Sequence, residues 1–257
     1  ISVVNALSEW MLVEVSRDGG VFMQEYRRGV PQYPVRRAGR ASTTGTKVSF
    51  KPDAKIFETV EFDSAIIEER LRETAFLNPG LEISFDDGWK RATFHFENGL
   101  RDFIAYLNTK RETLYDPVIL SAERDGVIIE IAMQHTSGYA YDVLSFANNV
   151  RTREGGTHVA GFRVGLGRAI RKFMDDHRLV KNDLRPSLED ICEGLTAVVS
   201  VRLPDPQFEG QTKAKLGNNE IRQVVEDCMM ATLLDYLNKH IDIGKVIVEK
   251  ATEAMRA

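Results

Sequence analysis

The stretch 193–220 constrains the fold most strongly, because it reads as a strand, a loop and a long helix in immediate succession. Within 195–203, apolar residues recur at every second position, which is the side-chain period of a β-strand. Pro204 and Pro206 end this strand, since a proline has no N–H to donate to a neighbouring strand. A helix is predicted from about Asn218 onward. The chain must therefore carry an exposed loop between a sheet and a helix.

That loop has a polar, cationic tip at 210–213. Lys213 offers an ammonium group and Gln211 a side-chain amide, and both groups are suited to hold a phosphate. An ordinary solvated loop lysine is the alternative interpretation. The local composition alone does not decide between the two.

Composition and charge limit the classes of protein that fit. The chain has 257 residues, 43% of them hydrophobic, which suffices for one or two globular domains. Its formal net charge of −4 argues against a generally basic nucleic-acid binder, so any DNA contact must come from a local patch. Cys192 and Cys228 lack the spacing of a zinc site, and no apolar run reaches the ~20 residues of a membrane span. We therefore expect a reduced, cytoplasmic protein with no metal site in this chain.

Residues 1–98 are predicted to mix antiparallel hairpins with one helix, an α+β arrangement. The hairpin strands are expected at 11–16, 21–26, 81–85 and 92–96. Asp63 is placed to cap a helix that runs through Phe76. Residues 1–8 lack an initiator Met and read as the middle of a helix, as expected for a piece of a larger protein.

Residues 99–257 are predicted to alternate strands and helices around a sheet. Strands are expected at 116–123, 127–134, 141–148 and 195–203, and helices at 100–107, 157–177, 187–192, 219–240 and 241–257. Gly155 and Gly156 are expected to form a turn, and Thr157 to cap the helix that follows. The glycines of that helix form neither a P-loop nor a dinucleotide fingerprint.

Four strings in the chain stand out together. They are SVVNALS at 2–8, TTGTKVSF at 43–50, EGGTH at 154–158 followed by GFR at 161–163, and PDPQFEGQTK at 204–213. They resemble the B subunits of the bacterial type IIA topoisomerases, the family of DNA gyrase and topoisomerase IV, and the resemblance spans essentially the whole chain. It implies the C-terminal part of a GHKL (Bergerat) ATPase sandwich over 1–98. A transducer domain would follow over 99–257, with a ribosomal-protein-like βαβ unit and a left-handed crossover, against the usual hand.

The resemblance also implies roles for single residues. Lys213 and Gln211 would contact the terminal phosphate of ATP. The ATP pocket or its mouth would include Ile1, Ser2, Thr46, Val48 and, at the position used by coumarin inhibitors, Arg17. For Thr46 an ordinary strand-entry turn is the alternative, and for Arg17 a solvated hairpin arginine.

Two groups of cations are candidates for DNA contact. On the helix predicted at 157–177, the resemblance implies that four residues line the cavity through which DNA passes: Arg163, Arg168, Arg171 and Lys172. The stretch 27–40 carries five arginines and no acid, and it can also meet DNA phosphate. A plain solvated face competes with the DNA interpretation for both groups.

The function implied is that of an ATP-hydrolysing DNA topoisomerase, in which this part couples ATP binding and hydrolysis to strand passage and negative supercoiling. DNA gyrase is the favoured member, with topoisomerase IV or a MutL-type GHKL ATPase as alternatives. The implied partners are the gyrase A subunit in a heterotetramer of two A and two B subunits, double-stranded DNA, ATP and coumarin-type inhibitors. The family's general-base glutamate and Mg²⁺ ligand precede the region matched here, so we expect this chain alone not to hydrolyse ATP.

Overall fold

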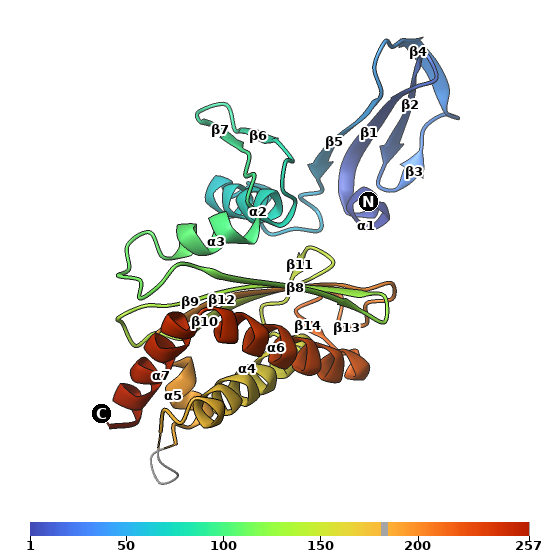
Figure 1. The fold of residues 1–257 in the computed structure, drawn as a ribbon. Coiled ribbons are helices and arrows are strands. Elements are labelled where there is room, and N and C mark those ends of the chain that lie inside the picture. The colour runs from blue at the N-terminus through green and yellow to red at the C-terminus, as the bar shows by residue number, and fades with distance from the viewer. Residues whose placement is uncertain (181–184, 257) are drawn as a thin grey trace. The chain divides into compact units, whose positions relative to one another are not determined.

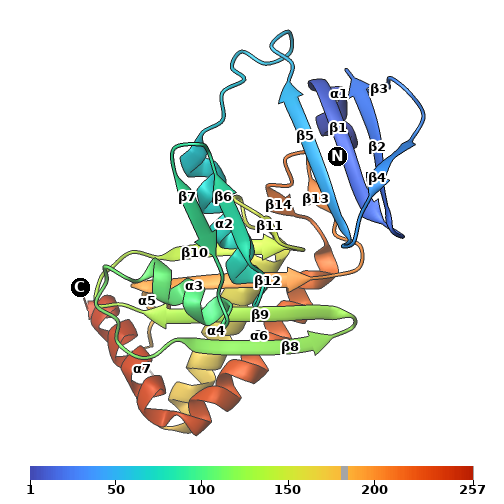
Figure 2. The same cartoon turned by 90° about the horizontal axis from the view of Figure 1, so that it is seen from above.

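The structure is a computed structural model that describes residues 1–180 and 185–256. The chain divides into two compact units, Ile1–Ile67 and Glu68–Ala257. Figures 1 and 2 show the elements of both units in two views. The domain boundary predicted near residue 98, between the ATPase part and the transducer domain that the resemblance implies, stays a prediction.

The first unit is an antiparallel sheet preceded by a short helix. Its elements are α1 (Ser2–Ala6), β1 (Ser8–Arg17), β2 (Gly20–Arg27), β3 (Val30–Pro31), β4 (Arg36–Arg40) and β5 (Gly45–Pro52). The strand order is β3-β2-β1-β5, and β4 also pairs with β2. The predicted first hairpin is confirmed: Arg17 pairs with Gly20, and Asp18 and Gly19 turn the chain with positive φ.

Helix α2 (Ser64–Leu77) begins where the sequence predicted. The Asp63 carboxylate accepts hydrogen bonds from the N–H groups of Ala65 at 2.8 Å and Ile66 at 3.2 Å, which confirms Asp63 as the cap. The predicted second hairpin is also present, as β6 (Ile83–Asp86) and β7 (Arg91–Phe94). Its turn exposes the side chain of Trp89 almost completely.

The second unit is built on a five-stranded sheet with the order β11-β10-β12-β9-β8. The strands are β8 (Val118–Arg124), β9 (Val127–His135), β10 (Asp142–Ala147), β11 (Val150–Arg151) and β12 (Leu195–Arg202). Strands β10 and β12 are parallel, and the chain passes between them through α4 (Thr157–Asp176) and α5 (Leu188–Cys192). This arrangement is the predicted βαβ unit, and together with the antiparallel strands it confirms the α+β class; the left-handed crossover stays a prediction.

Helices cover both faces of this sheet (Figure 1). On one face lie α4, α5, α6 (Asn219–Lys239) and α7 (Ile241–Arg256), and on the other lie the end of α2 and α3 (Leu100–Leu107). Each face has its own hydrophobic core. The alternation along β12 therefore separates two cores and not a core from solvent: Val199 belongs to the α4 side and Val198 to the α3 side.

The sequence prediction for the start of α4 is wrong in one respect. Gly156, not Thr157, is the residue before the helix. Among the residues that the structure describes, no side chain caps this helix and the buried Thr157 hydroxyl has no hydrogen-bond partner. Gly156 takes this place because its backbone, with φ 137° and ψ −164°, lies directly against Leu216. Nearly all other predicted helices and strands appear within a few residues of their expected bounds, and Ala257, the last residue of the predicted final helix, lies outside the described residues.

Candidate functional site

The loop after β12 is a small hairpin whose tip carries the predicted phosphate-binding residues. Strands β13 (Phe208–Glu209) and β14 (Lys215–Leu216) pair in antiparallel register, and the segment 210–213 between them is exposed. Gly210 has φ 74°, a conformation that favours glycine, and so supports the tight turn. We call residues 208–216 the lysine hairpin. Its short strands were not predicted from the sequence, because two-residue strands leave no periodic pattern.

The base of the lysine hairpin is anchored in the core of the second unit. Leu216 is fully buried, and Phe208 packs against the same hydrophobic cluster. Asn218, at the start of α6, is also buried and ties the two ends of the loop together. Its side-chain oxygen accepts a hydrogen bond from the Gln207 N–H at 2.7 Å, and its side-chain nitrogen donates to the carbonyl of Asp205 at 3.1 Å. Sequence reasoning placed the helix start at Asn218 but missed this role.

Lys213 is the free cation of this hairpin. Its ammonium group lies 5.5 Å from the centre of the Phe208 ring, and among the described residues no carboxylate lies within ion-pair distance of it. Its own backbone has φ 56°, which is uncommon for a residue with a side chain. The neighbouring Lys215, by contrast, is paired with Glu209 at 3.1 Å. The tip therefore presents one uncompensated charge to solvent, beside the exposed amide of Gln211.

Three of the four cations on α4 are already paired inside the second unit. Arg168 contacts Glu226 at 2.6 Å, Arg163 lies 3.6 Å from Glu189, and Lys172 pairs with Asp176 one turn away. Arg171 has no such acidic partner among the residues that the structure describes. These ion pairs balance much of the positive charge of the row and reduce its capacity to bind phosphate. The DNA role of the row stays a prediction.

Among the arginines of 27–40, some are likewise paired with acids and others are not. Arg28 donates a hydrogen bond to the buried Asp53 carboxylate at 2.5 Å, and this bond lowers the pKa of Asp53. Arg27 is paired with Glu25. Arg36 stacks over the Tyr33 ring at 4.2 Å. It lies, with Arg40, on the fully exposed strand β4, and neither has an acidic partner among the described residues.

The predicted residues of the ATP pocket all lie in the first unit. Thr46 and Val48 lie on β5, opposite Val15 and Val13 of β1, and their alternate positions put them on one face of the sheet. Ile1 precedes α1 and is largely exposed, and Ser2 is the first residue of α1. Arg17 ends β1, and its one ion pair among the described residues is with its neighbour Asp18 at 2.9 Å, with both side chains mostly in solvent.

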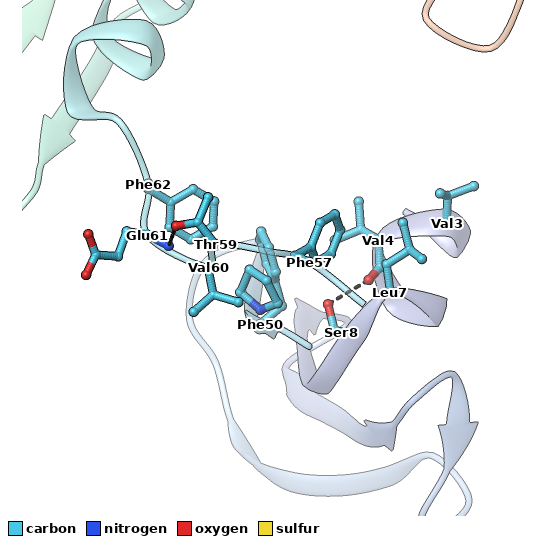
Figure 3. Close-up of a pocket in the computed structure, with 11 residues that line it drawn as sticks. Val3, Val4, Leu7, Ser8, Phe50, Phe57, Thr59, Val60, Glu61 and Phe62 are labelled. Carbon is cyan, nitrogen blue, oxygen red and sulfur yellow. Dashed lines mark hydrogen bonds between the residues drawn. The ribbon is translucent and has the colours of Figure 1, made fainter. Parts of the chain in front are cut away.

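A cavity of about 280 Å³ lies beside α1 and the end of β5 (Figure 3). Its lining is mostly apolar and consists of Val3, Val4, Leu7, Ser8, Phe50, Pro52, Phe57, Thr59, Val60, Glu61 and Phe62. Phe50 and Phe62 meet edge to face, with 6.1 Å between ring centres. None of the five residues predicted for the ATP pocket lines this cavity, although Phe50 shares the face of β5 with Thr46 and Val48. The sequence did not single out these aromatic residues.

The buried titratable groups of the second unit do not form a catalytic cluster. His135 and His158 are each fully enclosed, and burial lowers the pKa of both to about 4, so both are neutral at pH 7. Burial also raises the pKa of the Cys192 thiol, which makes it unreactive. In the described part of the chain no group of three or more His, Cys, Asp or Glu side chains is arranged to hold a metal ion. None of the described helices is long and apolar enough to span a bilayer.

The DNA gyrase B family model matches residues 99–257. The chain is 46% identical to the B subunit of the type 2 topoisomerase of Aquifex aeolicus and 46% identical to the B subunit of the DNA gyrase of Clostridium acetobutylicum, over its whole length in each case. It spans only 33% and 41% of these relatives. The 43K ATPase domain of Thermus thermophilus gyrase B, solved with an aminocoumarin, superimposes with a TM-score of 0.83 at 39% identity over 99% of this chain and 70% of that one.

Proposed function

Because this chain belongs to the DNA gyrase B family, we propose that it is the part of a type IIA topoisomerase B subunit that senses bound ATP and transmits its state. In the complete enzyme, with the gyrase A subunit, it would couple ATP binding and hydrolysis to DNA strand passage and negative supercoiling. The lysine hairpin is the observation that supports this proposal: Lys213, which has no acidic partner among the described residues, stands at the tip of an exposed loop whose base is fixed in the core.

The proposed role of Lys213 is to hold the terminal phosphate of ATP, with Gln211 beside it. ATP would supply the terminal phosphoanhydride bond whose hydrolysis drives the enzyme. A charge-assisted hydrogen bond to such an anion contributes about 1.5–3 kcal/mol, or roughly a tenfold to hundredfold effect. Because Lys213 has no competing carboxylate among the described residues, it loses no ion pair when it meets the phosphate. Release of the phosphate would free the hairpin, and with it the sheet and helices to which the hairpin is anchored.

The adenine side of the site is proposed to lie on the exposed face of β5. Thr46 would hydrogen-bond the base directly or through water, and Val48 would pack against the ring, with Ile1 and Ser2 completing the wall. This face offers a hydroxyl beside an apolar side chain, which suits a purine. Among the described residues it offers no carboxylate cluster that could hold Mg²⁺.

Arg17 is proposed to bind coumarin-type inhibitors at the mouth of that site. Its guanidinium is accessible, and its only ion pair among the described residues is to the adjacent Asp18, which water competes for freely. Double-stranded DNA is the other proposed partner. Because three cations of the α4 row are paired internally, we expect that row to contribute weak, sequence-independent contacts.

The deciding experiment compares Lys213→Ala with Lys215→Ala in the complete B subunit reconstituted with its A subunit. Both changes remove one lysine from the same hairpin, but Lys215 is already paired with Glu209. We expect Lys213→Ala to lower ATP turnover and supercoiling by about tenfold or more, and Lys215→Ala to change either by less than about threefold. Unchanged turnover and strand passage in Lys213→Ala would refute the proposal.

A further inference from the structure

The base of the lysine hairpin is bonded to the turn that precedes α4. The Glu154 N–H donates to the carbonyl of Ala214 at 2.9 Å, and the Leu216 N–H donates to the carbonyl of Gly155 at 3.1 Å. Gly156 and Leu216 form an isolated parallel bridge. The turn 154–156 therefore runs along β14 as a third short segment, and α4 begins at the next residue.

Gly156 makes this close approach possible in two independent ways. Its φ of 137° and ψ of −164° lie in a region that essentially only glycine occupies. A side-chain carbon placed on it would also lie 2.6 Å from the Leu216 amide nitrogen, and closer still to the Leu216 carbonyl oxygen. Both obstructing atoms belong to the backbone, so they cannot move aside as a flexible side chain can.

A side-chain carbon at Gly156 would press the Leu216 backbone away from the turn 154–156. Leu216 is fully buried in the main core, and Asn218, two residues later, is hydrogen-bonded to Gln207 at the other end of the loop. Lys213 lies three residues before Leu216, in the segment that leads from the tip of the hairpin into β14. We therefore expect a shift of Leu216 to be taken up in the hairpin and to change the position of its tip.

We propose that Gly156 is a positioning residue for Lys213: its backbone contact with Leu216 sets where the hairpin stands relative to α4, and so where the Lys213 ammonium lies. The inference rests on the proposed phosphate contact of Lys213. It adds that the hairpin is a rigid extension of the start of α4 and not a loop that moves by itself. Gly156 touches no substrate and acts only through Leu216.

A double-mutant cycle in the complete, reconstituted enzyme tests this role. The four proteins are the wild type, Gly156→Ala, Lys213→Ala and the double variant, and the readout is kcat for ATP. We expect Gly156→Ala alone to lower kcat by about tenfold. The double variant should be no slower than Lys213→Ala, because Gly156 acts only by placing Lys213 and has no effect once that lysine is removed. Losses that multiply would overturn the positioning role and leave the proposed function standing.

Two further variants keep the test decisive. Gly126→Ala, in the β8–β9 turn, also replaces a glycine of positive φ, here 75°, but its added carbon meets only the Pro204 ring at 3.9 Å, and it should leave kcat within about twofold. If Gly156→Ala does not fold, Gly155→Ala replaces it: its φ of 70° strains the residue whose carbonyl accepts the Leu216 N–H bond at 3.1 Å, while the added carbon meets only the flexible Val159 side chain at 3.4 Å. That variant should show the same non-additivity with Lys213→Ala, and multiplying losses would again overturn the role. An unaffected Lys213→Ala would instead overturn the proposed function together with this inference.

Discussion

Acid should destabilise the second unit well above the pH at which carboxylates are protonated, because two of its histidines are buried as neutral rings. His135 is 1% exposed; its Nε2 lies 2.9 Å from the carbonyl of Ile191 and its Nδ1 lies 2.5 Å from the Tyr115 hydroxyl. His158 is fully buried, and its Nδ1 has no hydrogen-bond partner among the described residues. Within the part of the chain that the structure describes, neither ring is paired with a carboxylate that could stabilise a charged imidazolium.

The size of the effect follows from the pKa of each histidine. In the folded protein the pKa of each is about 4, against 6.5 for an unperturbed histidine. Between these values the unfolded chain binds more protons, so stability is fully present above about pH 6.5 and is lost as the pH falls towards 4. Moving from pH 7 to pH 5 should cost about 2 kcal/mol for each histidine, or about 4 kcal/mol for both.

Urea unfolding at pH 7 and pH 5, followed by far-ultraviolet circular dichroism, measures this loss. The matched comparison is a His135→Gln, His158→Gln variant, which keeps a neutral polar side chain at both positions. It should be less stable at pH 7 but nearly insensitive to the change to pH 5. The carboxylates with lowered pKa values, such as Glu68 and Asp53, lose their contribution at lower pH and affect both proteins equally. If the wild type and the variant lose the same free energy between pH 7 and pH 5, the reasoning is refuted.

Three other predictions come from contacts of the described residues. Lys250→Met breaks a nearly buried ion pair with Glu193, at 3.0 Å, that ties α7 to the end of α5, and it should lower the free energy of urea unfolding by about 2 kcal/mol. Lys239→Met breaks an exposed ion pair with Asp235 and should lower it by less than about 0.5 kcal/mol. Gly161→Ala should cost about 3 kcal/mol, because the added carbon collides with backbone atoms of α6, while Gly167→Ala on the same helix meets only side-chain ends and should be nearly neutral; equal costs would contradict this reading. Arg36→Ala with Arg40→Ala should flatten the salt dependence of duplex DNA binding by about two units of slope and Arg27→Ala should not, as measured by fluorescence anisotropy.

Many of the helices, strands and turns could be predicted because they depend on patterns of neighbouring residues. The Asp63 cap, the two hairpin turns and the long helices each depend on residues a few positions apart, and all are confirmed. Family membership could be predicted because PDPQFEGQTK and EGGTH are long, specific strings, and the comparisons confirm it together with the fold class. The roles of individual site residues remain proposals.

What could not be predicted depends on contacts between distant parts of the chain. The burial of β12 on both faces requires α3 and α4 to lie on opposite sides of the sheet, and the alternation of its residues carries no such information. Arg163 and Arg168 of α4 looked available for DNA, yet each is paired with an acid from another helix, Glu189 of α5 and Glu226 of α6. Thr157 was predicted as the cap of α4 because threonine is one of the residues preferred at the position before a helix.

The error at Thr157 and the role of Gly156 have one cause. The preference for a capping residue normally depends only on the helix that follows it. Here the position before α4 must also accommodate the backbone of Leu216, which is distant in the sequence. A threonine at that position would gain a cap bond worth about 1 kcal/mol and collide with a strand it cannot displace. Glycine gives up the cap, the buried Thr157 hydroxyl stays unpaired, and the hairpin is held in contact with the helix. The usual preference for a capping side chain is therefore not met at the point where the lysine hairpin contacts the start of α4, and such departures are expected at functional contacts.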